Sequence, residues 1–111
     1  MIVDPFEWKA RVCYQGRCHF AGWDKGCDGP IQAAHIISKQ ALKRRGLQAF
    51  LWDVRNGVAA CYQHHRRSDS AHARFPRELL PAAAEEFARE LDLDWWLDDV
   101  YPHADVPHPG S

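Results

Sequence analysis

Short apolar runs separated by turn residues mark the first part of the chain, and the clearest of them spans residues 31–37. This run follows a Gly-rich stretch and predicts a strand. A second short strand is expected over 58–60, directly after the turn signal Asn56-Gly57. A helix over about 62–71 is expected to follow the second strand.

A further helix is predicted in the connection between the two strands. Ser38 is a residue type that caps helices, and it precedes a helix expected over 39–45 that Gly46 ends. Near the start of the chain, residues 6–14 are expected to form a short helix or an extended lead-in. The predicted order is therefore strand, inserted helix, strand, helix.

The last third of the chain has a helical spacing of apolar residues. Over 77–91 they recur three and four positions apart, which predicts an amphipathic helix beginning near Pro81. Residues 93–101 should form a second helix that lays its aromatic side chains on the core. The Pro-rich stretch 102–111 is expected to be frayed.

These elements predict an α+β fold in one domain, residues 1–111, with a core over about 13–72 and a helical tail over about 76–102. The first residues contain no basic segment followed by an apolar one, so no signal peptide is expected. No apolar run approaches the roughly 20 residues that a membrane span requires. A cytoplasmic protein without membrane contact is therefore predicted.

Charge is distributed unevenly along the chain, although the net charge is only -1. Residues 39–77 contain nine Lys and Arg residues against two acidic ones, whereas residues 78–111 contain nine acidic residues against one Arg. A basic middle segment is typical of a phosphate-binding surface, because nucleic-acid affinity comes largely from counterion displacement. The side chains expected to contact nucleic acid are Lys39, Lys43, Arg44, Arg45, Arg66 and Arg67.

Four cysteines could support so small a domain through a metal or through two disulfides. Cys61-x-x-His64 has the tightest metal-like spacing in the chain, and Cys27 in the Gly-rich loop 15–30 is expected to join it. Cys18 is the preferred fourth ligand and Cys13 the alternative. A structural Zn²⁺ held by Cys18, Cys27, Cys61 and His64 is predicted.

A second candidate site combines His35, Asn56, His65 and Asp69. His65 and Asp69 are four residues apart on the predicted helix, so both can reach one divalent ion. His35 ends the apolar strand, where a neutral imidazole could take a proton from water near pH 7. Asn56 is expected to brace the backbone of the loop that carries His35.

These residues resemble the HNH endonuclease family, in particular its small zinc-containing, phage-type members. The resemblance covers roughly residues 18–69 and implies the ββα-metal (His-Me finger) fold with a zinc-stapled loop. It also implies roles for three residues: His35 is the general base, Asn56 orients the loop of that base, and His65 binds the catalytic metal. The implied activity is nicking of DNA by a monomer with Mg²⁺, Mn²⁺ or Ni²⁺, in which Asp69 is a further metal ligand.

One position departs from the family pattern. Relatives generally carry a metal ligand immediately before the base, and here that residue is Ala34. Either His65 and Asp69 are sufficient to bind the catalytic metal, or His72 provides a further ligand. Alternatively, catalysis is lost and the protein is a zinc-stabilised DNA-binding module. A third reading is a protein-interaction domain that uses the acidic tail, which could recruit a larger phage packaging or replication protein, although it contains no motif for one.

Overall fold

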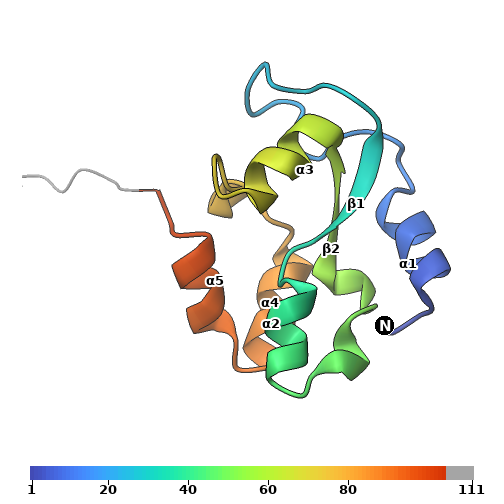
Figure 1. Ribbon diagram of the computed structural model, residues 1–111, viewed down its shortest axis with the longest axis vertical. Coiled ribbons are helices and arrows are strands. Elements are labelled where there is room, and N and C mark those ends of the chain that lie inside the picture. Colours follow the sequence, from blue (N-terminus) through green and yellow to red (C-terminus); the bar gives the residue numbers. More distant parts are fainter. Residues whose placement is uncertain (105–111) are drawn as a thin grey trace, which may run out of the picture.

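A pair of antiparallel strands lies at the centre of the fold. The computed structural model describes residues 1–104, and in that part of the chain β1 (Ile31–His35) pairs with β2 (Gly57–Cys61). His35 lies opposite Gly57 at one end of the pair, and Ile31 lies opposite Cys61 at the other. With the helices around them, the strands form a small α+β fold, as the sequence predicted (Figure 1).

The strand pair lies between two helices that contact both of its strands. α1 (Pro5–Val12) packs on one side, and α3 (Tyr62–Asp69) follows β2 without a break and packs on the other (Figure 1). The Asp4 side chain accepts a hydrogen bond from the backbone N–H of Glu7 and starts α1, with proline in the first turn. Of the two structures predicted for residues 6–14, a short helix or an extended segment, the helix is the one that forms.

Close packing of α1 explains Gly57. This residue has an extended backbone within β2, and the Trp8 and Val12 side chains lie so close to its Cα that any Cβ would collide with them. Asn56 ends a 3-10 helix, Val54–Asn56, that leads into the strand. The glycine at position 57 is therefore required because α1 packs closely on the sheet, and not because of the tight turn that the Asn-Gly pair predicted.

The inserted helix, α2 (Lys39–Arg44), forms where the sequence predicted it. The Ser38 hydroxyl accepts a hydrogen bond from the backbone N–H of Ala41, and Gly46 follows with φ of 71°, a conformation that favours glycine. Ala41 and Leu42 face the core, and the basic side chains of α2 are exposed.

Two helices form the tail: α4 (Ala82–Glu90) and α5 (Asp94–Val100). The amphipathic helix predicted to begin near Pro81 is α4, and Leu80, which is extended before Pro81, separates it from a short 3-10 helix, Arg77–Leu79. Residues 105–111 of the stretch expected to be frayed lie outside the described residues.

The tail packs on the strand region through one hydrophobic core. Phe87 and Leu97 from the tail are fully buried in the same cluster as Phe20, Ile37 and Leu42. The expectation that all tail aromatics face this core fails at one residue: Trp95 is 53% exposed, and its ring instead carries the Arg45 guanidinium, 5.0 Å from the ring centroid.

Within residues 1–104, no helix is both long enough and apolar enough to cross a membrane.

Candidate functional site

Four side chains gather at the Cys61 end of the strand pair. Cys61 ends β2 and also caps α3, where its sulfur accepts a hydrogen bond from the backbone N–H of His64. Cys18 and Cys27 come from the loop before β1, and the ligand atoms of the four residues lie within 4.8 Å of one another. The group has the composition that the sequence predicted, and Cys13 is not part of it.

The spacing within this cluster fits a tetrahedral metal. The Nδ1 atom of His64 lies 3.4 Å from the Cys18 sulfur and 3.3 Å from the Cys61 sulfur. With typical Zn–S and Zn–N bonds, a tetrahedral zinc ion separates sulfur and nitrogen ligands by about 3.5 Å. Three sulfurs and one imidazole nitrogen are also the donor set that structural zinc prefers. The cluster could therefore hold a structural metal such as zinc.

A carboxylate behind His64 fixes the ring for this task. His64 is fully buried, and its Nε2–H donates to Asp24 at 2.7 Å, so that Nδ1 is left to face the sulfurs. Arg67 donates to the same carboxylate at 2.9 Å. The hydrogen bonds from Arg67, which has the larger effect, and from His64 hold the pKa of Asp24 well below its usual range. An outer carboxylate of this kind orients a metal-binding imidazole. Asp24 could not be predicted as part of this site, because nothing in the pattern of loop 15–30 distinguishes it.

The three thiols influence one another. Burial opposes ionisation of Cys61, but hydrogen bonds from the backbone N–H groups of His64 and Asp28 outweigh it and lower the pKa of this thiol to about 7. Desolvation, together with the neighbouring Cys61 and Cys18, raises the pKa of Cys27 to about 12. A divalent cation between the sulfurs would offset the repulsion that opposes a second and third thiolate.

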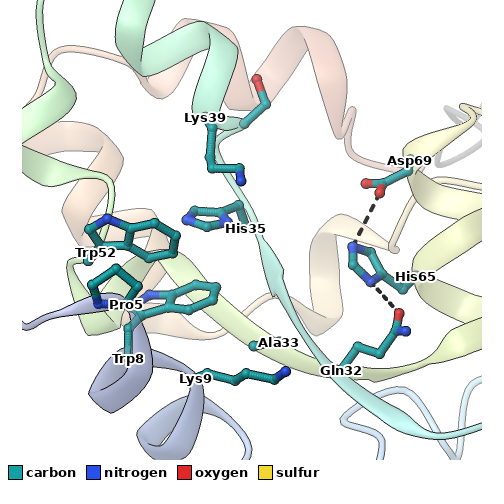
Figure 2. Close-up of a pocket in the computed structure, with 11 residues that line it drawn as sticks. Pro5, Trp8, Lys9, Gln32, Ala33, His35, Lys39, Trp52, His65 and Asp69 are labelled. Atoms are coloured by element: carbon teal, nitrogen blue, oxygen red, sulfur yellow. Dashed lines mark hydrogen bonds and ion pairs between the residues drawn. The ribbon is translucent and has the colours of Figure 1, made fainter.

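A separate cleft of about 670 Å³ runs along β1 between α1 and α3. His35 from the end of β1, His65 and Asp69 from α3, and Lys39 from the start of α2 all line it (Figure 2). The structure thus brings three of the four residues of the predicted catalytic site to one cavity. His64 and His65, although adjacent in sequence, belong to the cluster and to the cleft respectively.

His35 is fixed by stacking and by one hydrogen bond. Its ring stacks on Trp8 with centroids 4.2 Å apart, and Trp52 packs against it in a T-shaped arrangement with centroids 5.2 Å apart. The Nε2 atom lies 2.8 Å from the backbone carbonyl of Leu51, which can only accept, so Nε2 carries the proton and Nδ1 the lone pair. Burial lowers the pKa of His35 below its ordinary value, which leaves the ring neutral at pH 7.

Asn56 is fully buried and holds the backbone just after His35. Its amide oxygen accepts from the N–H of Ile37 at 2.7 Å, and its amide nitrogen donates to the carbonyl of Ile37 at 3.0 Å. Asn56 therefore makes the kind of backbone contact that the sequence predicted for it. The contact also explains why β1 ends at His35 and not at Ile37: the Ile37 backbone pairs with a side chain and not with β2.

His65 lies between two oxygen atoms. Its Nδ1–H donates to the Gln32 side-chain oxygen at 2.9 Å, and its Nε2 lies 3.2 Å from a carboxylate oxygen of Asp69 (Figure 2). With Nδ1 as donor, a neutral ring would turn a lone pair towards that carboxylate. A proton or a bound cation between Nε2 and Asp69 makes the contact attractive. Sequence reasoning missed Gln32, although its strand position was visible.

Within the described part of the chain, only two potential metal ligands lie close together at the candidate catalytic site, one from His65 and one from Asp69. Among residues 1–104, the Cys3His cluster is the only group of three or more potential ligands that lie together. Ala34, where relatives of the predicted family carry a ligand, is 1% exposed and packs in the core. His72 is exposed beyond the end of α3, because the helix stops at Asp69 and Ala71 has φ of 59°. His72 therefore does not line the cleft that holds His65 and Asp69.

The predicted nucleic-acid contacts lie at several places around the cleft, and Arg66 lines a hollow that shares Gln32, His65 and Asp69 with it. Lys39 lines the cleft, but Arg44 and Arg45 line a different hollow beside Trp96. Arg67 is engaged by Asp24, whereas Lys43 and Arg66 are exposed.

No family model, no curated protein and no solved structure matched the chain in three comparisons.

Proposed function

We propose that this protein is a metal-dependent DNA endonuclease of the HNH type, with a ββα-metal core and a structural Zn²⁺. The observation that carries the proposal is the cleft itself, in which His35, His65 and Asp69 come together beside Lys39 (Figure 2). The order β1, β2, α3, with His35 at the end of β1 and His65 on α3, supports the same proposal.

In this proposal His35 is the general base. Its Nδ1 carries the lone pair, its Nε2–H is held by the Leu51 carbonyl, and its lowered pKa keeps it unprotonated at neutral pH. A rigid neutral imidazole can take the proton of an attacking water molecule. Asn56 keeps this ring in place through the Ile37 backbone.

His65 and Asp69 are the proposed ligands of a divalent ion such as Mg²⁺, Mn²⁺ or Ni²⁺. Their facing atoms are 3.2 Å apart, close to the separation of about 3.0 Å between neighbouring ligands of an octahedral ion. Such an ion, when bound, stabilises the negative charge that develops on the phosphate. Gln32 orients His65 for this role by accepting its Nδ1–H.

The cluster of Cys18, Cys27, Cys61 and His64 is the proposed zinc site, with a structural task. It connects the loop before β1 to the junction of β2 and α3. His65 is the neighbour of His64, so the same zinc site fixes the start of the helix that presents the catalytic ligands.

The second candidate function is DNA binding without catalysis. Ala34 in the core and the presence of only two ligand atoms at His65 and Asp69 favour it. Both functions predict binding to DNA, and they differ only in whether the phosphodiester bond is hydrolysed.

Supercoiled plasmid separates the two functions. The purified full chain is incubated with plasmid and Mg²⁺, Mn²⁺ or Ni²⁺, and without added divalent ion. The endonuclease predicts nicked circles that depend on the ion and are lost in His65→Ala and Asp69→Ala, while zinc content stays unchanged. Binding without nicks under every ion would refute the endonuclease and support the binding module.

A further inference from the structure

We infer that Lys9 on α1 binds a phosphate of the DNA strand, so that the substrate is held between Lys9 and Lys39 across the cleft. The inference rests on the proposed function. It adds α1, which lies outside the basic segment 39–77, to the binding surface.

Lys9 and Lys39 approach the cleft from separate elements. Both line it, Lys39 at the end next to His35 and Lys9 at the other end beside Ala33 (Figure 2). The catalytic candidates lie along the same cavity. A strand that reaches both amines would therefore pass His35 and His65.

Both amines remain available to an anion. The ion pairs within residues 1–104 include neither lysine, and both residues are exposed. Arg11, the other basic residue of α1, is paired with Glu7 at 2.8 Å. Lys9 is thus the cation that α1 can offer to a phosphate.

The position of Lys9 is also fixed relative to the reacting groups. Its neighbour Trp8 is 3% exposed, stacks on His35 and donates its indole N–H to the Asp53 carbonyl at 3.0 Å. Gly57 lets this helix lie directly against β2. A phosphate contact on α1 therefore positions the strand against His35.

Charge in the cleft favours an anionic ligand. Two lysines face one carboxylate, Asp69, whose charge is already directed at His65. Each Lys or Arg that neutralises a DNA phosphate releases counterions, and this makes its contribution visible as salt dependence.

Binding of a 20-base-pair DNA duplex to the full chain, without added divalent ions, tests the inference at several salt concentrations. Lys9→Ala should weaken binding and lower the log-log slope by about 0.9. Lys9→Arg should keep the slope. Lys25→Ala is the matched control, because Lys25 is also exposed but does not line the cleft, and it should leave the slope unchanged.

The inference would be overturned if Lys9→Ala showed the same salt slope as the unmodified chain. It would also be overturned if the unmodified chain did not measurably bind the duplex. The nicking assay fails or succeeds separately. If the unmodified chain nicks DNA but Lys9→Ala leaves the salt slope unaltered, only the role of Lys9 is refuted. If Lys9→Ala reduces the slope but the chain does not nick DNA, the endonuclease proposal is refuted and Lys9 remains a phosphate contact.

Discussion

At the scale of single residues, His35 is defined by what surrounds its ring. Trp8 and Trp52 remove solvent from it, and the Leu51 carbonyl selects the tautomer with the lone pair on Nδ1. A surface histidine would titrate near 6.5 and be free to rotate. The surroundings of His35 change both properties.

The pH dependence of His35 follows from its burial. Burial penalises the imidazolium form, so the pKa lies below 6.5, and the neutral form that acts as a base is lost as the pH falls through that pKa. Cleavage should therefore persist to more acidic pH than an ordinary histidine base would allow, and it should decline as the pH falls through the lowered pKa. NMR titration of the His35 ring, assigned with His35→Gln, measures the midpoint directly. A midpoint above 6.5 would contradict the surroundings described for this ring.

Asn56 is expected to matter for stability as well as for the site. Asn56→Ala leaves the buried N–H and carbonyl of Ile37 without partners, which should cost about 2–4 kcal/mol of unfolding free energy. Urea denaturation measures the change. Gln48→Ala, at an exposed position, should change stability by less than about 0.5 kcal/mol. Equal effects of the two substitutions would show that the amide of Asn56 is not a structural brace.

The sequence predicts His35, Asn56 and His65 as site residues from their types, their positions and the resemblance to the HNH endonuclease family. It could not identify Asp24, because this residue reaches His64 only when loop 15–30 folds back on α3. Gln32 is a different case. Its polar side chain in a predicted apolar strand was a signal, but alternation places it on the face of the buried Ala34 and not on that of His35, so its contact with His65 could not be predicted.

At the scale of elements, Cys61 joins three structural tasks. It ends β2, caps α3 and contributes a sulfur to the Cys3His cluster. Loss of the cluster should therefore loosen the junction between the strand and the helix that carries His65.

The dependence of the fold on a bound metal can be tested with cysteine substitutions, because Cys13 provides a matched control. Cys27→Ser and Cys61→Ser should each lose about one bound zinc and lower the melting temperature markedly, because metal binding in small domains is coupled to folding. Cys13→Ser should keep the zinc, since Cys13 lies outside the cluster. Elemental analysis and thermal unfolding measure both effects. Protein prepared without chelators that contains no zinc would refute the metal site.

A buried arginine connects the segment before α4 to α4, α5 and the residue after α5. Arg77 is 5% exposed and donates to Glu85, to Asp98 and to the Tyr101 carbonyl. Arg77→Ala should lower the unfolding free energy by about 3 kcal/mol, because it leaves these acceptors without their cation. Arg89→Ala, at an exposed site on α4, is the control for chemical denaturation and should have little effect. Similar losses in both variants would show that the Arg77 network does not hold the tail.

Most element boundaries could be predicted because caps and turn residues mark them. Ser38 and Gly46 bound α2 as expected. The error at the end of β1 depends on a tertiary contact. β1 stops at His35, two residues before its predicted end, because the Asn56 side chain takes both hydrogen-bonding groups of the Ile37 backbone.

At the scale of the whole molecule, separation of charge along the chain is not separation in space. The acidic tail supplies partners to two residues of the basic segment: Glu90 pairs with Arg55, and Glu85 and Asp98 pair with Arg77. Only part of the positive charge counted in the sequence is therefore available to DNA. Sequence position cannot reveal this, because the pairing depends on how α4 and α5 dock.

The fold also divides the candidate chemistry between two places. The Cys3His cluster lies at the Cys61 end of the strand pair, and His35 lies at the opposite end. α3 links the two, since His64 belongs to the cluster and His65 to the cleft. Substitutions at His35 should therefore leave zinc content unchanged.

The nicking rate of His35→Ala at saturating protein is the most direct test of the proposed catalytic role. Loss of a general base should slow nicking at least about 10²-fold, while DNA affinity and zinc content stay close to those of the unmodified chain. His72→Ala, at an exposed histidine outside the cleft, should nick at the unmodified rate. Nicking by His35→Ala within a few-fold of the unmodified chain would contradict the assignment of His35 as the base.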